Sequence, residues 1–289
     1  MTYDEVMLRL DKLASHDPKD LAGMARFGIN VDKAWVISMP KLRILAKEIL
    51  SHYKIQKIDN NVSSLVANPG ISPVPSDLSS VALAKMKRDP HFRKDDTIKI
   101  QELHTLALEV WDSGIHEARI LAGLIDDPKM VTGEQMEKWV LGFDSWDVCD
   151  QTCGNLFDRT EFAIKKAHEW SKRSEEFVKR AGFVLMAGLA VHDKKLEDNV
   201  FIEFLDIIKR ESGDKRNFVR KAVNWALRSI GKSRNKYLYE KSIRVAEEIL
   251  GQAKDDSLVW SGTEIKAMNF IAGDAKRELE KDYIKNRFL

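Results

Sequence analysis

An aromatic ring and a carboxylate stand at helical spacing in the stretch FDSWDVCDQTCGNLF, which runs from Phe143 to Phe157. If this stretch is a helix, Trp146 and Asp150 are four residues apart and lie on one face. The neighbouring face is formed by Cys149, Thr152, Cys153 and Leu156, with Phe157 at its edge. An aromatic ring beside a carboxylate at the rim of a core is not explained by packing alone. Trp146 and Asp150 are therefore the first candidates for a site.

The start of this helix is predicted from the residues around Trp146. Asp144 or Ser145 is the expected N-cap, because a short oxygen-bearing side chain accepts hydrogen bonds from the free amides of the first turn. Asp147 then lies in the first turn, where the helix dipole favours a negative charge.

A second aromatic residue, Trp225, lies in a predicted helix from Arg216 to Ile230 and falls outside the apolar face of that helix. Residues 215–236 around it contain eight Lys or Arg and no Asp or Glu. A solvated charged face, with the Trp in a groove between helices, is the ordinary explanation of such a run. The same composition suits a phosphate-backbone surface, where cations replace counterions and a flat ring meets a sugar or base. The sequence leaves both interpretations open.

Arg180 is a charged residue at the edge of an apolar run. The predicted helix from Glu175 to Val191 carries no charge from Ala181 onward, so it is expected to be buried on most sides. A guanidinium there needs an anionic partner or an opening to solvent, because its desolvation costs several kcal/mol. Two partners are open: an internal carboxylate, for instance that of Asp150, or a phosphate held by the planar donors of the guanidinium.

Composition and length exclude several classes of protein. The chain has 289 residues, of which 44% are hydrophobic, enough to bury a sizeable core in one elongated domain or two compact ones. No apolar run approaches the roughly 20 residues that span a bilayer, and the amphipathic N-terminus does not resemble a signal peptide. The two cysteines, four residues apart on one predicted helix, argue against a disulfide framework and a zinc site and indicate a reducing cytoplasm. With a net charge of +2, the charge of the whole chain does not indicate a partner.

Helices are predicted nearly throughout, because Gly and Pro are sparse and apolar residues recur at three and four positions. The predicted helices are Tyr3–Leu13, Met39–His52, Leu103–Asp112, Ile115–Ile125, Gly133–Leu141, Ser145–Phe157, Glu161–Ser171, Glu175–Val191, Asn199–Glu211, Arg216–Ile230, Asn235–Leu250 and Ser261–Tyr283. Pairs that recur about every 35 to 45 residues suit a solenoid of HEAT-like repeats with a concave surface for a partner. An irregular helical bundle is the alternative.

The expected organisation is a single α-helical domain over residues 1–289. An irregular connection or insertion is predicted at about 56–99, with one possible short helix at Leu78–Lys87. The stretch VDKAWVISMP, residues 31–40, is predicted to be a loop.

Three of these segments together resemble the AlkD-like DNA alkylation-repair proteins. They are FDSWDVCDQTCGNLF, EEFVKRAGFVLMAGLAVHDK and RNFVRKAVNWALRSIGK, which occur in the order of that family with ordinary spacing. SMPKLRILAKEI and WDSGIHEARILAGLIDDP are similar to members of the family as well. The resemblance covers about Ile100 to Leu250, and the stretch from Gln56 to Lys99 departs from the family pattern.

The resemblance implies a right-handed array of HEAT-like repeats that cradles duplex DNA on a concave basic surface. It also implies a DNA glycosylase that removes N3- and N7-alkylpurines without a metal or nucleotide cofactor and without a deep nucleobase pocket. By position, Asp150 matches the catalytic Asp of the family, and Arg180 matches its phosphate-binding Arg. Trp146 and Trp225 match its two aromatic contacts to the lesion nucleotide. Further DNA contacts are expected from Lys179, Arg216, Arg220, Lys221, Arg228 and Lys232.

Two other functions fit the same sequence: a helical-repeat protein that binds nucleic acid structures without base excision, and a scaffold for protein partners. The acid-free basic run argues against the scaffold. No membrane partner is expected, and a monomer is the expected state. His116 and His192, each at a helix end, are expected to cap or pair locally, and Cys149 and Cys153 to be small core residues. The tryptophans expected to serve only packing are Trp35, Trp111, Trp139, Trp170 and Trp260.

Overall fold

The computed structural model describes residues 1–15, 17–53, 94–255 and 260–288, and these form helices and connecting loops without a β-strand. They divide into two compact units, Met1–Glu161 and Phe162–Leu289, which are described in turn. Among the helices of the described ranges, none is long and apolar enough to cross a membrane. The expectation of one domain over residues 1–289 stays a prediction.

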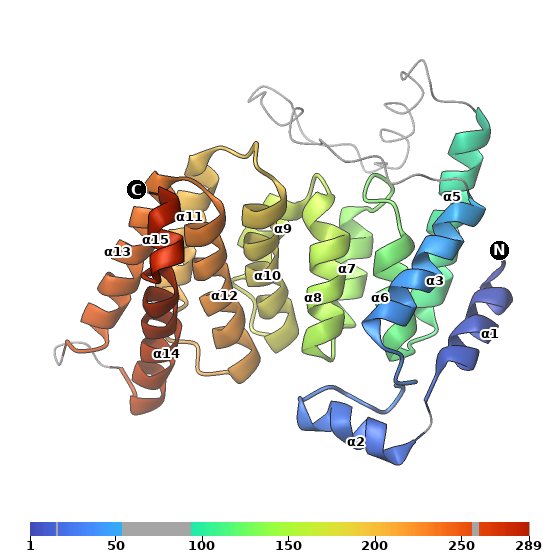
Figure 1. Ribbon diagram of the computed structural model, residues 1–289, viewed down its shortest axis with the longest axis horizontal. Helices are drawn as coiled ribbons and strands as arrows, with labels where there is room; N and C mark the ends of the chain where they lie inside the picture. The colour runs from blue at the N-terminus through green and yellow to red at the C-terminus, as the bar shows by residue number, and fades with distance from the viewer. Residues whose placement is uncertain (16, 54–93, 256–259, 289) are drawn as a thin grey trace. The chain divides into compact units, whose positions relative to one another are not determined.

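The first unit is organised around a helix that is buried along its whole length. Its described elements are α1 (Tyr3–Leu13), α2 (Pro18–Arg26), α3 (Met39–His52), α5 (Lys94–Asp112), α6 (His116–Ile125), α7 (Gly133–Leu141), α8 (Trp146–Asn155) and the 3-10 helix η2 (Phe157–Arg159) (Figure 1). Helix α6 packs against α3, α5 and α8, and all of its residues are buried. The buried set includes His116, Glu117 and Arg119, so three polar side chains of α6 need partners inside the unit.

An aromatic cluster connects α5 and α7 to the residues that precede and follow α8. The rings of Trp111 and Trp139 stack with centroids 4.2 Å apart and planes 4° apart. Phe143 and Phe157 pack against the same pair at centroid distances of 5.9 and 6.1 Å. Trp139 and Phe157 are fully buried, so this cluster is a principal core of the unit.

The second unit is organised around α10 and α12. Its described helices are α9 (Ala163–Trp170), α10 (Glu176–His192), α11 (Asp198–Arg210), α12 (Asn217–Ser233), α13 (Lys236–Gln252), α14 (Gly262–Leu279) and α15 (Asp282–Phe288) (Figure 1). Helix α10 packs against both α9 and α12. Gly182 allows the approach to α9, because a Cβ atom at this position would lie 2.6 Å from the backbone nitrogen of Ser171.

Contacts at a nearly constant sequence separation show the repeat of this unit. At the start of α10 and α12, Glu176 accepts from the backbone of Phe218, 42 residues later. At their ends, Lys194 donates to the carbonyl of Ser233, 39 residues later. The two helices therefore run parallel. Helices α12 and α14 are related in the same way, because their two ion pairs both join residues 46 positions apart. Helix α10 thus packs parallel to α12, and α12 packs parallel to α14. This arrangement is that of a stack of helical pairs in which each pair spans about 40 residues.

Most of the predicted helices are confirmed within one to three residues, and residues 31–38 are a loop as expected. Helix α2 was not predicted, and it is short and has no buried residue. Helix α5 begins at Lys94 rather than Leu103, within the stretch predicted to be irregular. Its apolar spacing supports the extension, since Ile100 is buried on the same side as Leu103. The predicted helix Leu78–Lys87 lies outside the described residues.

Two predicted helices end earlier than expected. The helix predicted for Ser145–Phe157 is α8 followed by η2, because Leu156 leaves the helical conformation at φ −130° and ψ −62°. Phe157 was placed at the edge of the apolar face of this helix, and that placement is wrong: it is fully buried. The helix predicted for Ser261–Tyr283 is divided between α14 and α15.

The aromatic cluster generates a stability prediction. We expect Trp139→Ala to lower the free energy of unfolding by about 3 to 5 kcal/mol, because it opens a cavity beneath Trp111. Leu141→Ala on the same helix is the control, since Leu141 is 60% exposed and its loss should cost less than about 0.5 kcal/mol. Urea unfolding followed by circular dichroism measures both values. Equal effects of the two substitutions would contradict the assigned core.

Candidate functional site

Helix α8 places Trp146 and Asp150 one turn apart at the edge of the core of the first unit. Both side chains are half-buried, whereas Val148, Cys149 and Cys153 are fully buried. The edge position predicted for the Trp and the Asp is therefore confirmed, as is the core position of the cysteines. Burial raises the pKa of the Cys153 thiol well above its ordinary value, which keeps it neutral.

The residues that begin α8 bind a distant loop instead of capping their own helix. Ser145, one of the two predicted N-caps, is the N-cap, but the predicted side-chain cap is wrong: its hydroxyl accepts a hydrogen bond from the backbone nitrogen of Asn30 at 2.9 Å rather than from its own first turn. The carboxylate of Asp144 accepts from Asn30 Nδ2 at 3.1 Å and from Arg119 Nη2 at 2.7 Å. Arg119 also donates to the carbonyl of Gly142 at 2.7 Å. The start of α8 is thus tied to both α6 and the segment after α2.

The first turn of α8 makes two further long-range contacts. The indole Nε1 of Trp146 donates to the carbonyl oxygen of Phe27 at 3.0 Å. His116 Nε2 lies 2.8 Å from a carboxylate oxygen of Asp147. The expectation that His116 caps or pairs locally is wrong, because its partner lies 31 residues away on α8. Packing of α6 against α8 brings the pair together.

Sequence reasoning missed Phe27, Asn30 and Arg119 as neighbours of this site. For Arg119 a signal exists, because a cation within the apolar helix HEARILAGLI needs a buried partner. Phe27 contributes a backbone carbonyl and Asn30 lies in a loop, so neither has a helical spacing that would reveal its position.

In the second unit, Arg180 lies on α10 and is 5% exposed. Its Nη1 donates to the carbonyl oxygen of Phe218, in the first turn of α12, at 2.6 Å. This contact agrees with the prediction that Arg180 lies at the edge of the apolar run, because the side chain extends from α10 to the neighbouring helix α12. Its pairing with Asp150 or with a phosphate stays a prediction.

Trp225 lies on α12 outside the apolar face, as predicted. It is half-buried, whereas the apolar face of α12 is fully buried at Val219, Ala222, Val223, Ala226, Leu227 and Ile230. Trp225 and Arg180 belong to the second unit and Trp146 and Asp150 to the first, so a common site formed by the four residues stays a prediction.

The basic run of residues 215–236 is free of acids in the sequence but not in space. Arg216 pairs with Asp214 at 2.6 Å, in the turn just before the run. Two acids of α14 meet cations of α12: Asp274 lies 3.3 Å from Arg228, and Glu278 lies 2.7 Å from Lys232. The composition of residues 215–236 did not reveal the two acids of α14, because α14 begins more than 25 residues after the run ends.

Lys179 is also occupied by carboxylates. It is 9% exposed, and its ammonium lies 2.7 Å from Glu211 and 3.0 Å from Asp214. Its expected DNA contact stays a prediction that would require breaking these pairs. Arg220 and Lys221 differ from it: the guanidinium of Arg220 lies 5.1 Å from the ring centroid of Phe270, and Lys221 is exposed without an ion pair in the described ranges.

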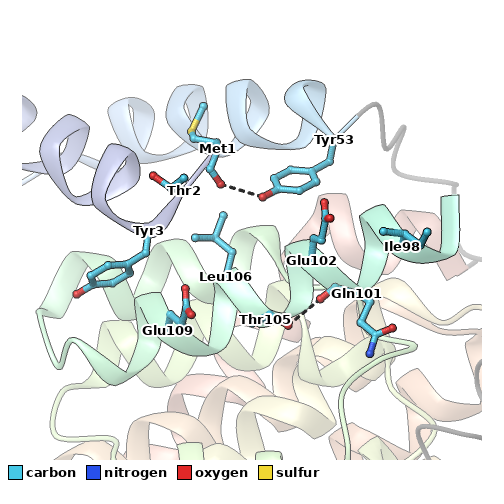
Figure 2. A pocket seen from close by; sticks show the side chains of 10 residues that line it. All are labelled: Met1, Thr2, Tyr3, Tyr53, Ile98, Gln101, Glu102, Thr105, Leu106 and Glu109. Carbon is cyan, nitrogen blue, oxygen red and sulfur yellow. Dashed lines mark hydrogen bonds between the residues drawn. The ribbon is translucent and has the colours of Figure 1, made fainter. Parts of the chain in front are cut away.

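A hollow of about 410 Å³ lies elsewhere in the first unit, between α1, α5 and the end of α3 (Figure 2). The hydroxyl of Tyr53 donates across it to the carbonyl of Met1 at 2.9 Å. Burial and the nearby carboxylates of Glu102 and Glu109 raise the pKa of Tyr53. Its lining includes neither Trp146 nor Asp150, so it is separate from the candidate site.

Comparison with known proteins identifies a family. A family model described as DNA alkylation repair enzyme matches residues 80–241, more than half of the chain. No curated protein matches the sequence. A solved structure is similar with a TM-score of 0.60 and 16% identity, covering 96% of this chain and 97% of that one. It is described as a member of a new family of proteins related to the HEAT-like repeat DNA glycosylases with affinity for branched DNA structures. The predicted fold class, an all-α array of HEAT-like repeats, is confirmed.

The Asp214 cluster gives the second unit a defined acid sensitivity. Burial opposes ionisation, but hydrogen bonds from Arg216 and Lys179 outweigh it and lower the pKa of Asp214 from 3.8 to about 2. A carboxyl group whose pKa is lowered by folding stabilises the folded state at pH values above its ordinary pKa. This contribution is lost as the pH falls toward the folded-state pKa of about 2.

We therefore expect Asp214→Asn to reduce the free energy of unfolding by about 1 to 2 kcal/mol at pH 7, and by clearly less at pH 3. Urea unfolding of both proteins at the two pH values measures the difference. Asp206→Asn, at an exposed position on α11, is the control and should change little. A difference that is independent of pH would show that the carboxylate of Asp214 does not act through its charge.

Proposed function

The chain belongs to the DNA alkylation repair enzyme family, and we propose that it is a DNA glycosylase that hydrolyses the N-glycosidic bond of cationic alkylated purines in duplex DNA. The observation that carries the proposal is the pair Trp146 and Asp150, half-buried on one face of α8. N3- and N7-alkylpurines fit this pair, because they are already positively charged and leave without being protonated. The alternative is binding of DNA structures without excision.

Asp150 is proposed as the electrostatic catalyst. As the bond to the purine breaks, positive charge develops at C1′ of the sugar. A carboxylate beside C1′ stabilises this charge and can orient the attacking water, and both effects are stronger at a partly desolvated position such as that of Asp150. The face of Trp146 favours the same charge. We expect neither a metal nor a nucleotide cofactor, because the leaving group needs no further activation.

Trp225 and Arg180 are assigned their roles through the family resemblance. Trp225 is half-buried and off the apolar face of α12, so one part of its ring remains available for the lesion nucleotide. Arg180, with Nη1 on the carbonyl of Phe218, holds its planar donors in a fixed direction, which suits a phosphate. We propose that Trp225 contacts the lesion nucleotide and that Arg180 binds a phosphate of the DNA backbone.

Contacts to the DNA backbone are proposed to differ in strength along α12. Arg220 and Lys221 are not engaged with carboxylates, so they can neutralise phosphates directly. For Arg216, Arg228 and Lys232 a phosphate would have to replace an existing carboxylate partner. The same holds for Lys179 on α10. These four cations should therefore contribute less to affinity.

The catalytic proposal is tested by release of free base from duplex DNA that carries N7-methylguanine or N3-methyladenine. We expect the wild-type protein to release base, and Asp150→Asn to do so at least about 100-fold more slowly, with unchanged DNA affinity. Asp112→Asn removes an exposed carboxylate of the same unit and is expected to leave the rate unchanged.

A second candidate function follows from the structural neighbour, which has affinity for branched DNA. If the wild-type protein releases no base but binds a four-way junction more tightly than a duplex, the excision proposal is wrong and a DNA-structure-binding role replaces it. Release of base by the wild type at a rate that Asp150→Asn does not lower would instead place the catalyst elsewhere.

Salt dependence tests the DNA surface on α12. We expect Lys221→Ala to reduce the slope of log affinity against log salt by about 1, because one phosphate contact is lost. Lys232→Ala is the matched control on the same helix, and its effect should be smaller because Lys232 already pairs with Glu278. Binding of a fluorescent duplex, measured across a salt series, gives both slopes. A larger effect of Lys232→Ala would contradict the proposed ranking.

A further inference from the structure

The loop from Phe27 to Ser38, between α2 and α3, is held at both ends by the core of the first unit. Near its start, Phe27 accepts from the indole of Trp146, and Asn30 bonds to the start of α8. In its middle, the carbonyl of Lys33 accepts from the backbone nitrogen of His116 at 3.0 Å. Near its end, the loop is bound by Glu117. The loop therefore joins the first turn of α6 to the first turn of α8.

Glu117 makes the contacts that define the end of this loop. It is 2% exposed, and its Oε2 accepts from the backbone nitrogen of Trp35 at 2.8 Å. Its Oε1 accepts from the backbone nitrogen of Ile37 at 3.2 Å. A carboxylate buried this deeply is costly unless donors and a favourable field compensate it. The two amides and the first turn of α6 supply both.

Val36, between the two bound amides, has a strained backbone. Its φ is 52°, in the left-handed region that a β-branched residue avoids. Such a conformation costs about 1 to 3 kcal/mol and persists only where the surroundings over-determine it. Here both flanking residues donate to one carboxylate, so Glu117 sets the direction of the chain on each side of Val36.

Trp146 depends on this loop because its polar atom has its partner there. The indole is half-buried, and Nε1 donates to the carbonyl of Phe27 at 3.0 Å. Phe27 itself is 72% exposed, so packing of its own side chain does not fix the carbonyl. The carbonyl lies at the C-terminal end of α2, where the backbone nitrogens of Gly28 and Ile29 donate back to this helix, and the loop that continues from it is anchored to α6 and α8.

We infer that Glu117 is a positioning residue that orients the indole of Trp146 through the strained loop from Phe27 to Ser38. This inference rests on the proposed function, in which Trp146 contacts the lesion nucleotide. Glu117 acts without touching DNA. Its loss lets Val36 leave the left-handed conformation, which moves the loop and frees the indole to turn away from the position beside Asp150.

The test uses the full-length protein labelled with 5-fluorotryptophan, in which Trp146→Phe identifies the fluorine resonance of Trp146. We expect Glu117→Gln, which keeps one acceptor oxygen, to shift or broaden that resonance while the resonances of the buried Trp139 and Trp170 stay in place. Glu134→Gln, at an exposed carboxylate in the first turn of α7, is the matched control and should change none of them. Val36→Gly in the Glu117→Gln background should restore the Trp146 resonance, because glycine adopts the left-handed conformation without strain.

Kinetics separate positioning from general stability. In base release, Glu117→Gln should lower kcat by roughly tenfold with little change in KM, and Val36→Gly should recover most of the loss. An unchanged Trp146 resonance overturns the inference. So does a collapse of all tryptophan resonances that Val36→Gly does not reverse, since Glu117 would then support the whole unit.

The resonance experiment needs no DNA, so its outcome is distinct from that of the proposed function. If the wild-type protein releases no base while Glu117→Gln still shifts the Trp146 resonance alone, excision is wrong and the positioning of Trp146 by Glu117 stands. A second variant, Asn30→Ala, removes the hydrogen bond that the side-chain amide of Asn30 donates to Asp144. It should produce a smaller shift of the same resonance.

Discussion

Buried polar side chains need partners, and in the first unit several of these side chains lie together at the start of one helix. Three residues of the first two turns of α6 are buried and polar, and each contacts a different segment. His116 meets Asp147 on α8, Glu117 meets the loop after α2, and Arg119 meets the connection from α7 to α8. Apolar packing brings these helices together, but the polar contacts decide how the segments around α8 are aligned. The geometry of the candidate site follows from that alignment.

Helical periodicity predicted what lies on a single helix. The half-buried positions of Trp146 and Asp150, and the position of Trp225 outside a fully buried apolar face, required only the angle between successive residues. The same rule failed for Phe157, because the chain leaves the helix at Leu156 before Phe157 is reached. A wheel describes neighbours only as long as the helix continues.

Contacts between elements were largely beyond sequence reasoning. Ser145, one of the two predicted N-caps, begins α8, yet its hydroxyl accepts from a loop residue 115 positions away instead of from its own helix. Similarly, the absence of acids in residues 215–236 left a solvated charged face and a phosphate-binding surface both open, and it did not reveal that Asp214, Asp274 and Glu278 pair with cations of the run. Local composition reports the charge of a segment, but the charge of a surface depends on which helices pack beside it. Arg220 and Lys221 are cations of that run that are not engaged with carboxylates of the described residues, so a role in phosphate binding remains open for them.

The ion pairs between α12 and α14 bear on how such a chain changes over generations. Arg228 and Asp274, and one turn later Lys232 and Glu278, join positions with the same separation of 46 residues. Replacing one member removes the attraction between the two helices, whereas exchanging both members preserves it. Substitutions at these positions are therefore expected to be inherited together among relatives, and an insertion between the two helices would be tolerated only where it leaves the facing turns in register.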